Sequence, residues 1–310
     1  MSHDKPERHR YPLRRMLLSC LALAAGMAVV VWIDLESTRK PVETGNASAA
    51  GPTLADLVAG KLAIVDLAWS LNPQSAYWPG DNYKPFELRT IATLEKDGVL
   101  SKAFASPEHL GTHLDAANHF ERERPSVDKI PAATLFAPGV VIDVSGAVSA
   151  NADYLVSVED IKRFEATHGR IPAAAVVLAY TGWSRFWDNP ARYQGRDVMG
   201  RLHFPGFSSE AVEFLIAERG IRGVGLDTMS VDHGLSRDFP VHHVLGKASR
   251  YGLENLARLA ELPARGFYLF VAPMKIETGS GGPVRVFAVF PREGAKSAGT
   301  PAKPNAADGN

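Results

Sequence analysis

Apolar runs alternate with helix-like segments along this chain, and this alternation constrains the fold more than any other feature. Strands are expected at residues 62–67, 86–94, 138–144, 173–180, 223–226, 266–272 and 284–290. Helices are expected at 53–61, 157–167, 208–220 and 248–262, and Ser157 and Asp160 have the spacing of a capping box. Strands that are apolar throughout are buried on both faces. The pattern therefore predicts an α/β domain with a largely buried sheet.

Both ends of the chain differ in composition from this domain. Basic residues precede an uncharged run at 16–33, which predicts a signal peptide or membrane anchor over residues 1–33, as an apolar helix. Small and polar residues indicate a linker at 34–55 and a disordered tail at 294–310. The domain is expected at 56–293 and outside the cytoplasm, either periplasmic or anchored through residues 16–33. Cleavage and retention of the N-terminal segment both stay open.

The charge balance argues against one class of partner. The 310 residues contain 34 Lys and Arg against 34 Asp and Glu, so the chain lacks the basic excess of a nucleic-acid-binding protein. No nucleic-acid partner is therefore expected. Its one cysteine excludes an internal disulfide.

Three histidines and an aspartate fall within residues 109–119. Neutral imidazole and carboxylate are ligands of Zn²⁺ and Mn²⁺. On a regular helix Asp115 would point away from His109 and His113, and on a regular strand these histidines would lie roughly 13 Å apart. Only a turn through Gly111 brings all three together, so the segment predicts a metal or catalytic site. The alternative is a polar surface loop.

A second cluster combines His242 and His243 with Glu254, twelve residues after His242. A continuous helix would place His242 and Glu254 about 18 Å apart. Gly246 and Gly252 are positions where the chain can fold back and bring them together. On spacing alone, a solvated helix face is the stronger interpretation.

Several segments together resemble the metal-dependent cyclase family, which includes bacterial kynurenine formamidases and isatin hydrolases. Residues 109–120 are similar to its H-x-G-T-H-x-D-x-P-x-H signature, with Ala117 in place of the proline. The resemblance extends over about residues 64–288 and includes 78–81, 203–206, 225–232, 240–242 with Glu254, and 273–285. It implies a single domain of the swivelling β/α type.

The resemblance also implies roles for individual residues. His109, His113 and Asp115 would hold a divalent metal, Zn or Mn, and Asp115 would bridge to a second ion held by His242 and Glu254. One or two ions are expected. His119 would act as general acid/base while the metal activates a water. The alternative for His119 is that it orients a ligand, and His243 is expected to be a neighbour only.

The expected function is a metal-dependent hydrolase that cleaves a linear or cyclic amide, with arylformamidase-type activity as the nearest label. Trp78, Trp183 and Phe239 are expected to line the pocket of a small-molecule substrate, although each is also suited to core packing. One alternative is hydrolysis of a lactone or lactam ring. Another is a non-catalytic extracytoplasmic protein that binds metal or a small molecule. The resemblance further implies a homo-oligomer.

Overall fold

The computed structural model describes residues 53–292 of the protein. The expected signal peptide or anchor at 1–33, with its apolar helix, lies outside the described residues, as do most of the linker and the tail. These features and the extracytoplasmic location stay predictions. Within residues 53–292, no helix is long and apolar enough to cross a membrane. The predicted homo-oligomer also stays a prediction.

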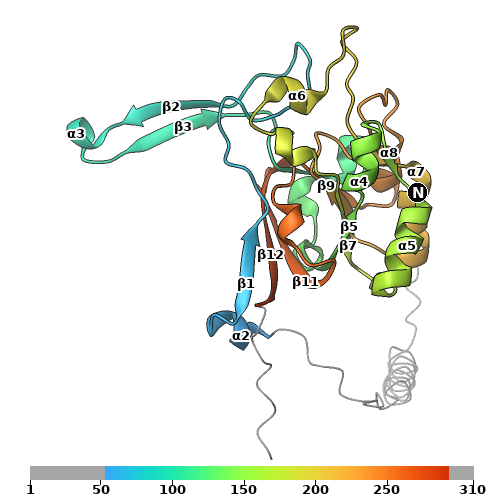
Figure 1. Ribbon diagram of the computed structural model, residues 1–310. Helices are drawn as coiled ribbons and strands as arrows, with labels where there is room; N and C mark the ends of the chain where they lie inside the picture. Colours follow the sequence, from blue (N-terminus) through green and yellow to red (C-terminus); the bar gives the residue numbers. More distant parts are fainter. Residues whose placement is uncertain (1–52, 293–310) are drawn as a thin grey trace, which may run out of the picture. The chain divides into compact units, whose positions relative to one another are not determined.

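The described part is an α/β domain built on one closed mixed sheet, as Figure 1 shows in part. The strand order is β1-β12-β11-β5-β7-β9-β10-β4, and β4 also pairs with β12, which closes a ring of seven strands. Strands β5, β7, β9 and β10 are parallel, and the remaining pairings are antiparallel. The strands are β1 Leu62–Asp66, β4 His113–Asp115, β5 Phe136–Asp143, β7 Val176–Tyr180, β9 Gly223–Leu226, β10 Tyr251–Glu254, β11 Arg265–Pro273 and β12 Gly281–Pro291.

Closure depends on the length of β12. Its first residues pair with β4, with Gly281 opposite Asp115 and Pro283 opposite His113, and its last residues pair with β1. A Cβ at Gly281 would lie 2.5 Å from the carbonyl oxygen of Leu114, so only glycine lets β12 approach β4 this closely. The sheet therefore closes beside the histidine-rich segment.

Side chains of the parallel strands alternate between two hydrophobic cores. Val141, Val176 and Leu178 face the interior of the closed sheet, whereas Val177 and Ala179 pack against the helices outside it. Figure 1 shows α5 and α7 side by side over this outer face. The helices are α2 Leu54–Val58, α3 Leu94–Asp97, α4 Ser145–Ala150, α5 Val158–His168, α6 Pro190–Gln194, α7 Ser209–Arg219 and α8 Pro240–Lys247. The prediction of a largely buried sheet is thus confirmed.

Short elements complete the domain. Five 3₁₀ turns connect the main elements, and β6 pairs with β8 in a separate two-stranded sheet. They are η1 Ala117–His119, η2 Val127–Lys129, η3 Ala132–Leu135, η4 Trp183–Phe186 and η5 Leu259–Glu261, with β6 at Leu155–Val156 and β8 at Gly206–Phe207.

The predicted helix at 248–262 is wrong. This segment forms β10 and, after a turn, η5. Ser249, Asn255 and Arg258 have left-handed backbone conformations, with φ of 52°, 55° and 58°, which interrupt any helix. Strand β10 instead inserts between β9 and β4, where its backbone groups complete two ladders. Burial in the sheet has therefore overridden the local helical preference of the sequence.

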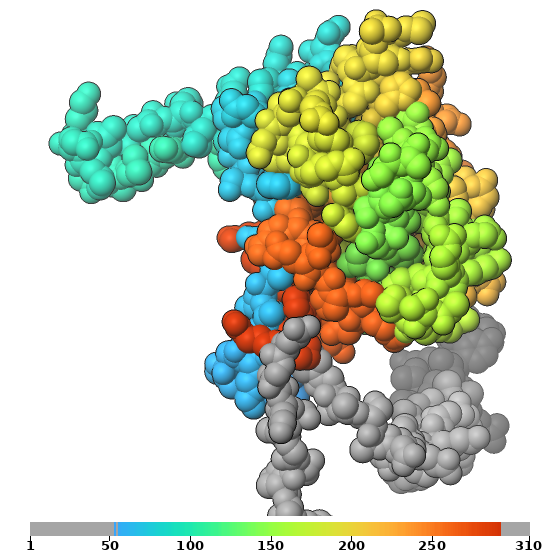
Figure 2. Space-filling model, in the orientation of Figure 1, coloured from blue at the N-terminus to red at the C-terminus, as the bar shows by residue number. Residues whose placement is uncertain are grey.

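A two-stranded ribbon, β2 Glu87–Ala92 and β3 Ser101–Ala105, extends away from the body of the domain (Figures 1 and 2). The two strands pair only with each other. The ribbon and its connecting turn leave large apolar side chains exposed, namely Leu88, Ile91, Leu94, Val99, Leu100 and Phe104.

Candidate metal centre

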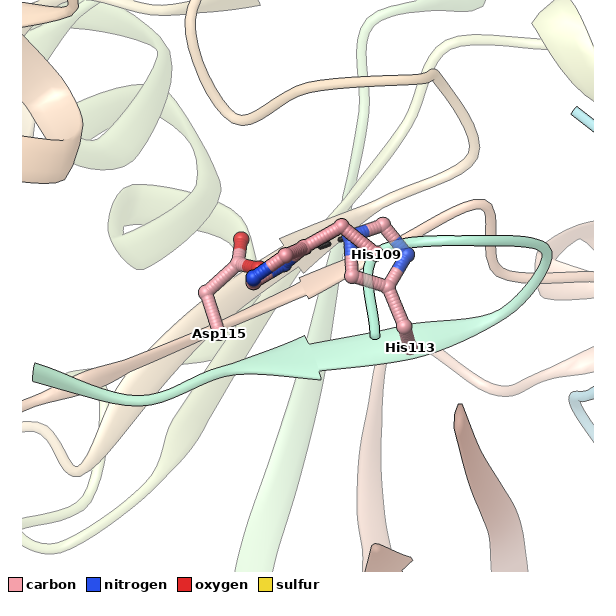
Figure 3. Close-up of side chains that lie close together, drawn as sticks. All are labelled: His109, His113 and Asp115. Atoms are coloured by element: carbon pink, nitrogen blue, oxygen red, sulfur yellow. Dashed lines mark hydrogen bonds and ion pairs between the residues drawn. The ribbon is translucent and has the colours of Figure 1, made fainter. Parts of the chain in front are cut away.

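The residues predicted as ligands converge at one end of β4 and β10. His113 and Asp115 lie on β4, and Glu254, which ends β10, is the register partner of His113. His109 lies before the turn at Gly111, whose φ of 63° reverses the chain direction. In Figure 3 the side chains of His109, His113 and Asp115 point toward one another above β4. The predicted turn through Gly111 is therefore present.

Two groups of three potential ligands share Asp115. The first contains His109, His113 and Asp115, and the second contains Asp115, His242 and Glu254. In each group the ligand atoms lie within 4.8 Å of one another. His113 Nε2 lies 3.3 Å from Glu254 Oε2, which links the two groups. His242 comes from the first turn of α8.

Hydrogen bonds fix two of the imidazoles by their Nδ1 atoms. His113 Nδ1 lies 2.9 Å from the carbonyl oxygen of Gly111, and His242 Nδ1 lies 2.6 Å from Asp232 Oδ2. Asp232 also accepts the backbone N–H groups of Val241 and His242, so one carboxylate holds both the start of α8 and its histidine. In both residues Nδ1–H donates to an acceptor outside the two groups of ligands. The Nε2 atom then faces the carboxylates of Asp115 and Glu254.

His109 has the opposite orientation. Its Nε2 lies 2.9 Å from Ser280 Oγ, and Ser280 donates both its hydroxyl and its backbone N–H to Glu108 Oε2, at 2.6 and 2.9 Å. Because the hydroxyl proton points to Glu108, Ser280 Oγ accepts from His109 Nε2–H. Nδ1 of His109 then faces Asp115 Oδ1, 2.6 Å away.

These residues fit a divalent cation. Asp115 is buried, and its Oδ2 has no hydrogen-bond partner among the described residues, which is costly unless a cation or water completes it. Burial lowers the pKa of the His113 imidazole, but the carboxylates of Asp115 and Glu254 outweigh burial and raise it to about 10. Burial raises the pKa of Asp115, and the surrounding imidazoles bring it well below its usual value. The pocket thus strongly favours positive charge, and imidazole nitrogens with carboxylate oxygens suit Zn²⁺ or Mn²⁺.

His119 lies against this cluster without joining either group of ligands. It ends η1, and its ring stacks on that of His109, with centroids 3.8 Å apart and 18° between the planes. Burial lowers the pKa of His119 to about 3, so its imidazole is neutral at neutral pH. Within residues 53–292 its ring forms no hydrogen bond, which leaves it available to a bound molecule.

A hollow of about 190 Å³ lies over His119 and over the five potential ligands, which together are called the ligand cluster: His109, His113, Asp115, His242 and Glu254. Trp78 and Phe239 form part of its wall and meet edge to face, with centroids 5.4 Å apart. Trp183 does not reach the hollow, because its indole is buried in the outer core and donates to the carbonyl oxygen of Tyr193. Other residues that line the hollow, and that the sequence did not single out, are Tyr83, Phe120, Met229 and Ser230.

Sequence reasoning gave no role to Glu108, Asp232 or Ser280. Ser280 is 171 residues from His109, so no local spacing connects the two. The segments that resemble the cyclase family include Asp232 and Ser280, and that similarity was the only signal in the sequence.

Ser280→Ala is expected to weaken metal binding about 10- to 100-fold, because His109 Nε2–H loses its acceptor and the ring is free to turn. Competition with a chromogenic chelator measures the metal affinity. Ser280→Thr, which keeps the hydroxyl, should restore most of it. Ser149→Ala removes an exposed hydroxyl on α4 and serves as the control. An affinity that Ser280→Ala leaves unchanged would show that this hydroxyl does not orient His109.

Comparison with known proteins gives consistent matches. A family model described as "Putative cyclase" matches residues 65–233. The isatin hydrolase of Roseibium aggregatum is 33% identical over 253 residues, which cover 77% of this chain and 95% of that protein. The kynurenine formamidase of Salinibacter ruber is 29% identical, over 72% of this chain and 96% of that protein.

Solved structures agree with these matches. Isatin hydrolase A from Ralstonia solanacearum superimposes with a TM-score of 0.73 at 37% identity, over 79% of this chain and all of that one. An isatin hydrolase bound to the product analogue thioisatinate gives a TM-score of 0.73 at 32% identity, over 77% of this chain and 96% of that one.

Proposed function

Because this chain belongs to the cyclase family, we propose that it is a metal-dependent hydrolase that opens a small cyclic aromatic amide. The observation that carries this proposal is the composition of the hollow beside His119. Its wall combines four aromatic residues with the metal ligands and contains no Lys or Arg; the four are Trp78, Tyr83, Phe120 and Phe239. A neutral, flat ring therefore matches the wall better than a charged, flexible molecule.

The size of the hollow favours the same substrate class. Pockets for drug-sized ligands have volumes of roughly 300–1,000 Å³, and this hollow has about 190 Å³. Formylkynurenine, the linear amide of the arylformamidase hypothesis, carries an ammonium and a carboxylate group. Apart from the metal ligands, the residues that line this hollow offer neither group an oppositely charged side chain, and burial of an unpaired charge is costly. Isatin has no such groups.

His109, His113, Asp115, His242 and Glu254 would hold the metal, as one ion or as two that share Asp115. When bound, the metal supplies a Lewis acid for the amide carbonyl and an activated water as nucleophile. The identity of the metal, Zn or Mn, stays a prediction.

His119 is suited to move the proton. Because His119 lines the hollow and belongs to neither group of metal ligands, a ring nitrogen can take a proton from the attacking water and return it to the leaving amide nitrogen. The aromatic wall would hold the substrate ring in place and exclude other water molecules. A protein that only binds a metal or a small molecule has no use for such a base, which favours hydrolysis over that alternative.

Substrate comparison tests the proposal. The full-length chain, loaded with Zn²⁺ or Mn²⁺, is expected to hydrolyse isatin with a kcat/KM at least about a hundredfold above that for formylkynurenine. A simple aromatic lactone under the same conditions tests the ring-ester variant. A preference for formylkynurenine would restore the arylformamidase hypothesis. Stoichiometric metal without hydrolysis of any of the three would favour the non-catalytic alternative.

A further inference from the structure

A second hollow lies at the opposite end of β10 from the candidate metal centre. It has a volume of about 250 Å³ and is bounded by the segment from η1 to η3 and by the residues that precede or begin β9 and β10. Tyr251 opens β10 at this hollow, whereas Glu254 ends the same strand at the ligand cluster. The two hollows share no lining residue.

Two guanidinium groups line this second hollow, and no carboxylate does. Arg222 donates to the backbone carbonyl groups of Ala133 and Phe136, which hold it in the wall. Arg250 forms neither a salt bridge nor a side-chain hydrogen bond with any residue of the described part. Its Nε is buried and has no hydrogen-bond acceptor within residues 53–292. A buried guanidinium N–H without an acceptor carries a desolvation cost that a bound anion would remove.

The rest of the wall is apolar. Ile130, Pro131, Pro125 and Ala117 contribute aliphatic surface, and Tyr251 contributes its ring. The hydroxyl of Tyr251 donates to the carbonyl oxygen of Thr134, so it is not a hydrogen-bond partner of Arg222 or Arg250. Inorganic phosphate would leave this apolar surface without a contact. An anion with a flat apolar body would use both parts of the wall.

We propose that this hollow is a second binding site, separate from the metal centre, for a small organic carboxylate whose apolar body packs on Ile130, Pro131 and Tyr251. The carboxylate accepts from Arg250 and from the remaining N–H groups of Arg222. A planar carboxylate suits a guanidinium because two parallel hydrogen bonds form. This proposal does not depend on the proposed hydrolysis.

Benzoate and its uncharged counterpart benzamide test the site in the full-length, metal-loaded protein. Isothermal titration calorimetry is expected to show benzoate binding that is at least about tenfold tighter than benzamide binding. Arg250→Met should weaken benzoate binding at least about tenfold, and Arg250→Lys, which keeps the charge, should weaken it less. Because Arg250 has no partner to lose, Arg250→Met should fold normally, and its melting temperature checks this. Lys247→Met removes an exposed charge nearby and is the matched control.

Several outcomes would overturn the proposal. Benzoate affinity that is equal in wild type and Arg250→Met would place benzoate at the metal centre. Equal affinities for benzoate and benzamide would remove the role of the charge. A change of oligomeric mass in Arg250→Met, measured by light scattering, with no change in benzoate affinity, would assign the hollow to a contact between copies of the chain. A loss of benzoate affinity in Lys247→Met equal to that in Arg250→Met would indicate a general effect of positive charge rather than a site at Arg250.

Discussion

His113→Ala is expected to lose bound metal and hydrolytic activity together. The Nε2 atom of His113 lies 3.4 Å from Asp115 Oδ1 and 3.3 Å from Glu254 Oε2, so this imidazole contacts both groups of ligands. Its removal leaves the carboxylates of Asp115 and Glu254 in place but takes away one imidazole nitrogen that could bind the metal. The loss of affinity should exceed the roughly 10- to 100-fold cost of losing an outer hydrogen-bond partner.

Elemental analysis after dialysis measures the metal content, and hydrolysis of isatin measures activity. His168→Ala, at the exposed end of α5, is the control and should keep both. Wild-type metal content in His113→Ala would refute its assignment as a ligand.

His119→Ala is expected to keep its metal and to lose about 10²- to 10⁴-fold in kcat, the usual contribution of a positioned acid/base group. His119 belongs to neither group of ligands, and its ring faces the hollow that the substrate would occupy. Metal content and melting temperature, measured on the same preparation, separate a chemical effect from a structural one.

Two results would contradict the role of His119. Unchanged turnover would exclude proton transfer by this residue. Loss of metal together with turnover would instead make His119 part of the metal centre, or a support for His109 through their stacked rings.

Local sequence signals predicted the elements that depend on local interactions. Helix α5 follows the capping box, in which Ser157 Oγ accepts from the backbone N–H of Asp160 and Asp160 Oδ2 accepts from that of Ser157. Strand β9 occupies the predicted residues 223–226. The apolar runs identified β1, β5, β7, β9, β11 and β12 of the closed sheet within a few residues, whereas β4 and β10 were not predicted as strands.

Features that depend on distant contacts were not predictable in this way. Leu253 and Leu256 are fully buried, and their neighbours in the sheet decide that residues 251–254 form a strand. Closure of the sheet requires β12 to meet β4, and no local pattern encodes this contact. Trp183 illustrates the same limit, because a tryptophan after a strand suits a pocket wall and a core equally well.

The candidate site was partly predictable. The density of histidines in residues 109–119, which include β4, identified His109, His113 and Asp115, and the need for a turn at Gly111 followed from geometry. His242 and Glu254 could be assigned only through the family resemblance, because their closeness depends on the strand that replaces the expected helix. The hydrogen bonds from Glu108 and Ser280 became visible only with the fold.

The position of β12 has a consequence for biosynthesis. Strand β4 is held on one side by β10 and on the other by the first residues of β12, and Ser280 immediately precedes β12. A ribosome must therefore synthesise the start of β12 before both neighbours of β4 exist. We therefore expect a cation to bind at full affinity only after β12 has paired with β4, and we expect a nascent chain that lacks β12 to be a poor chelator.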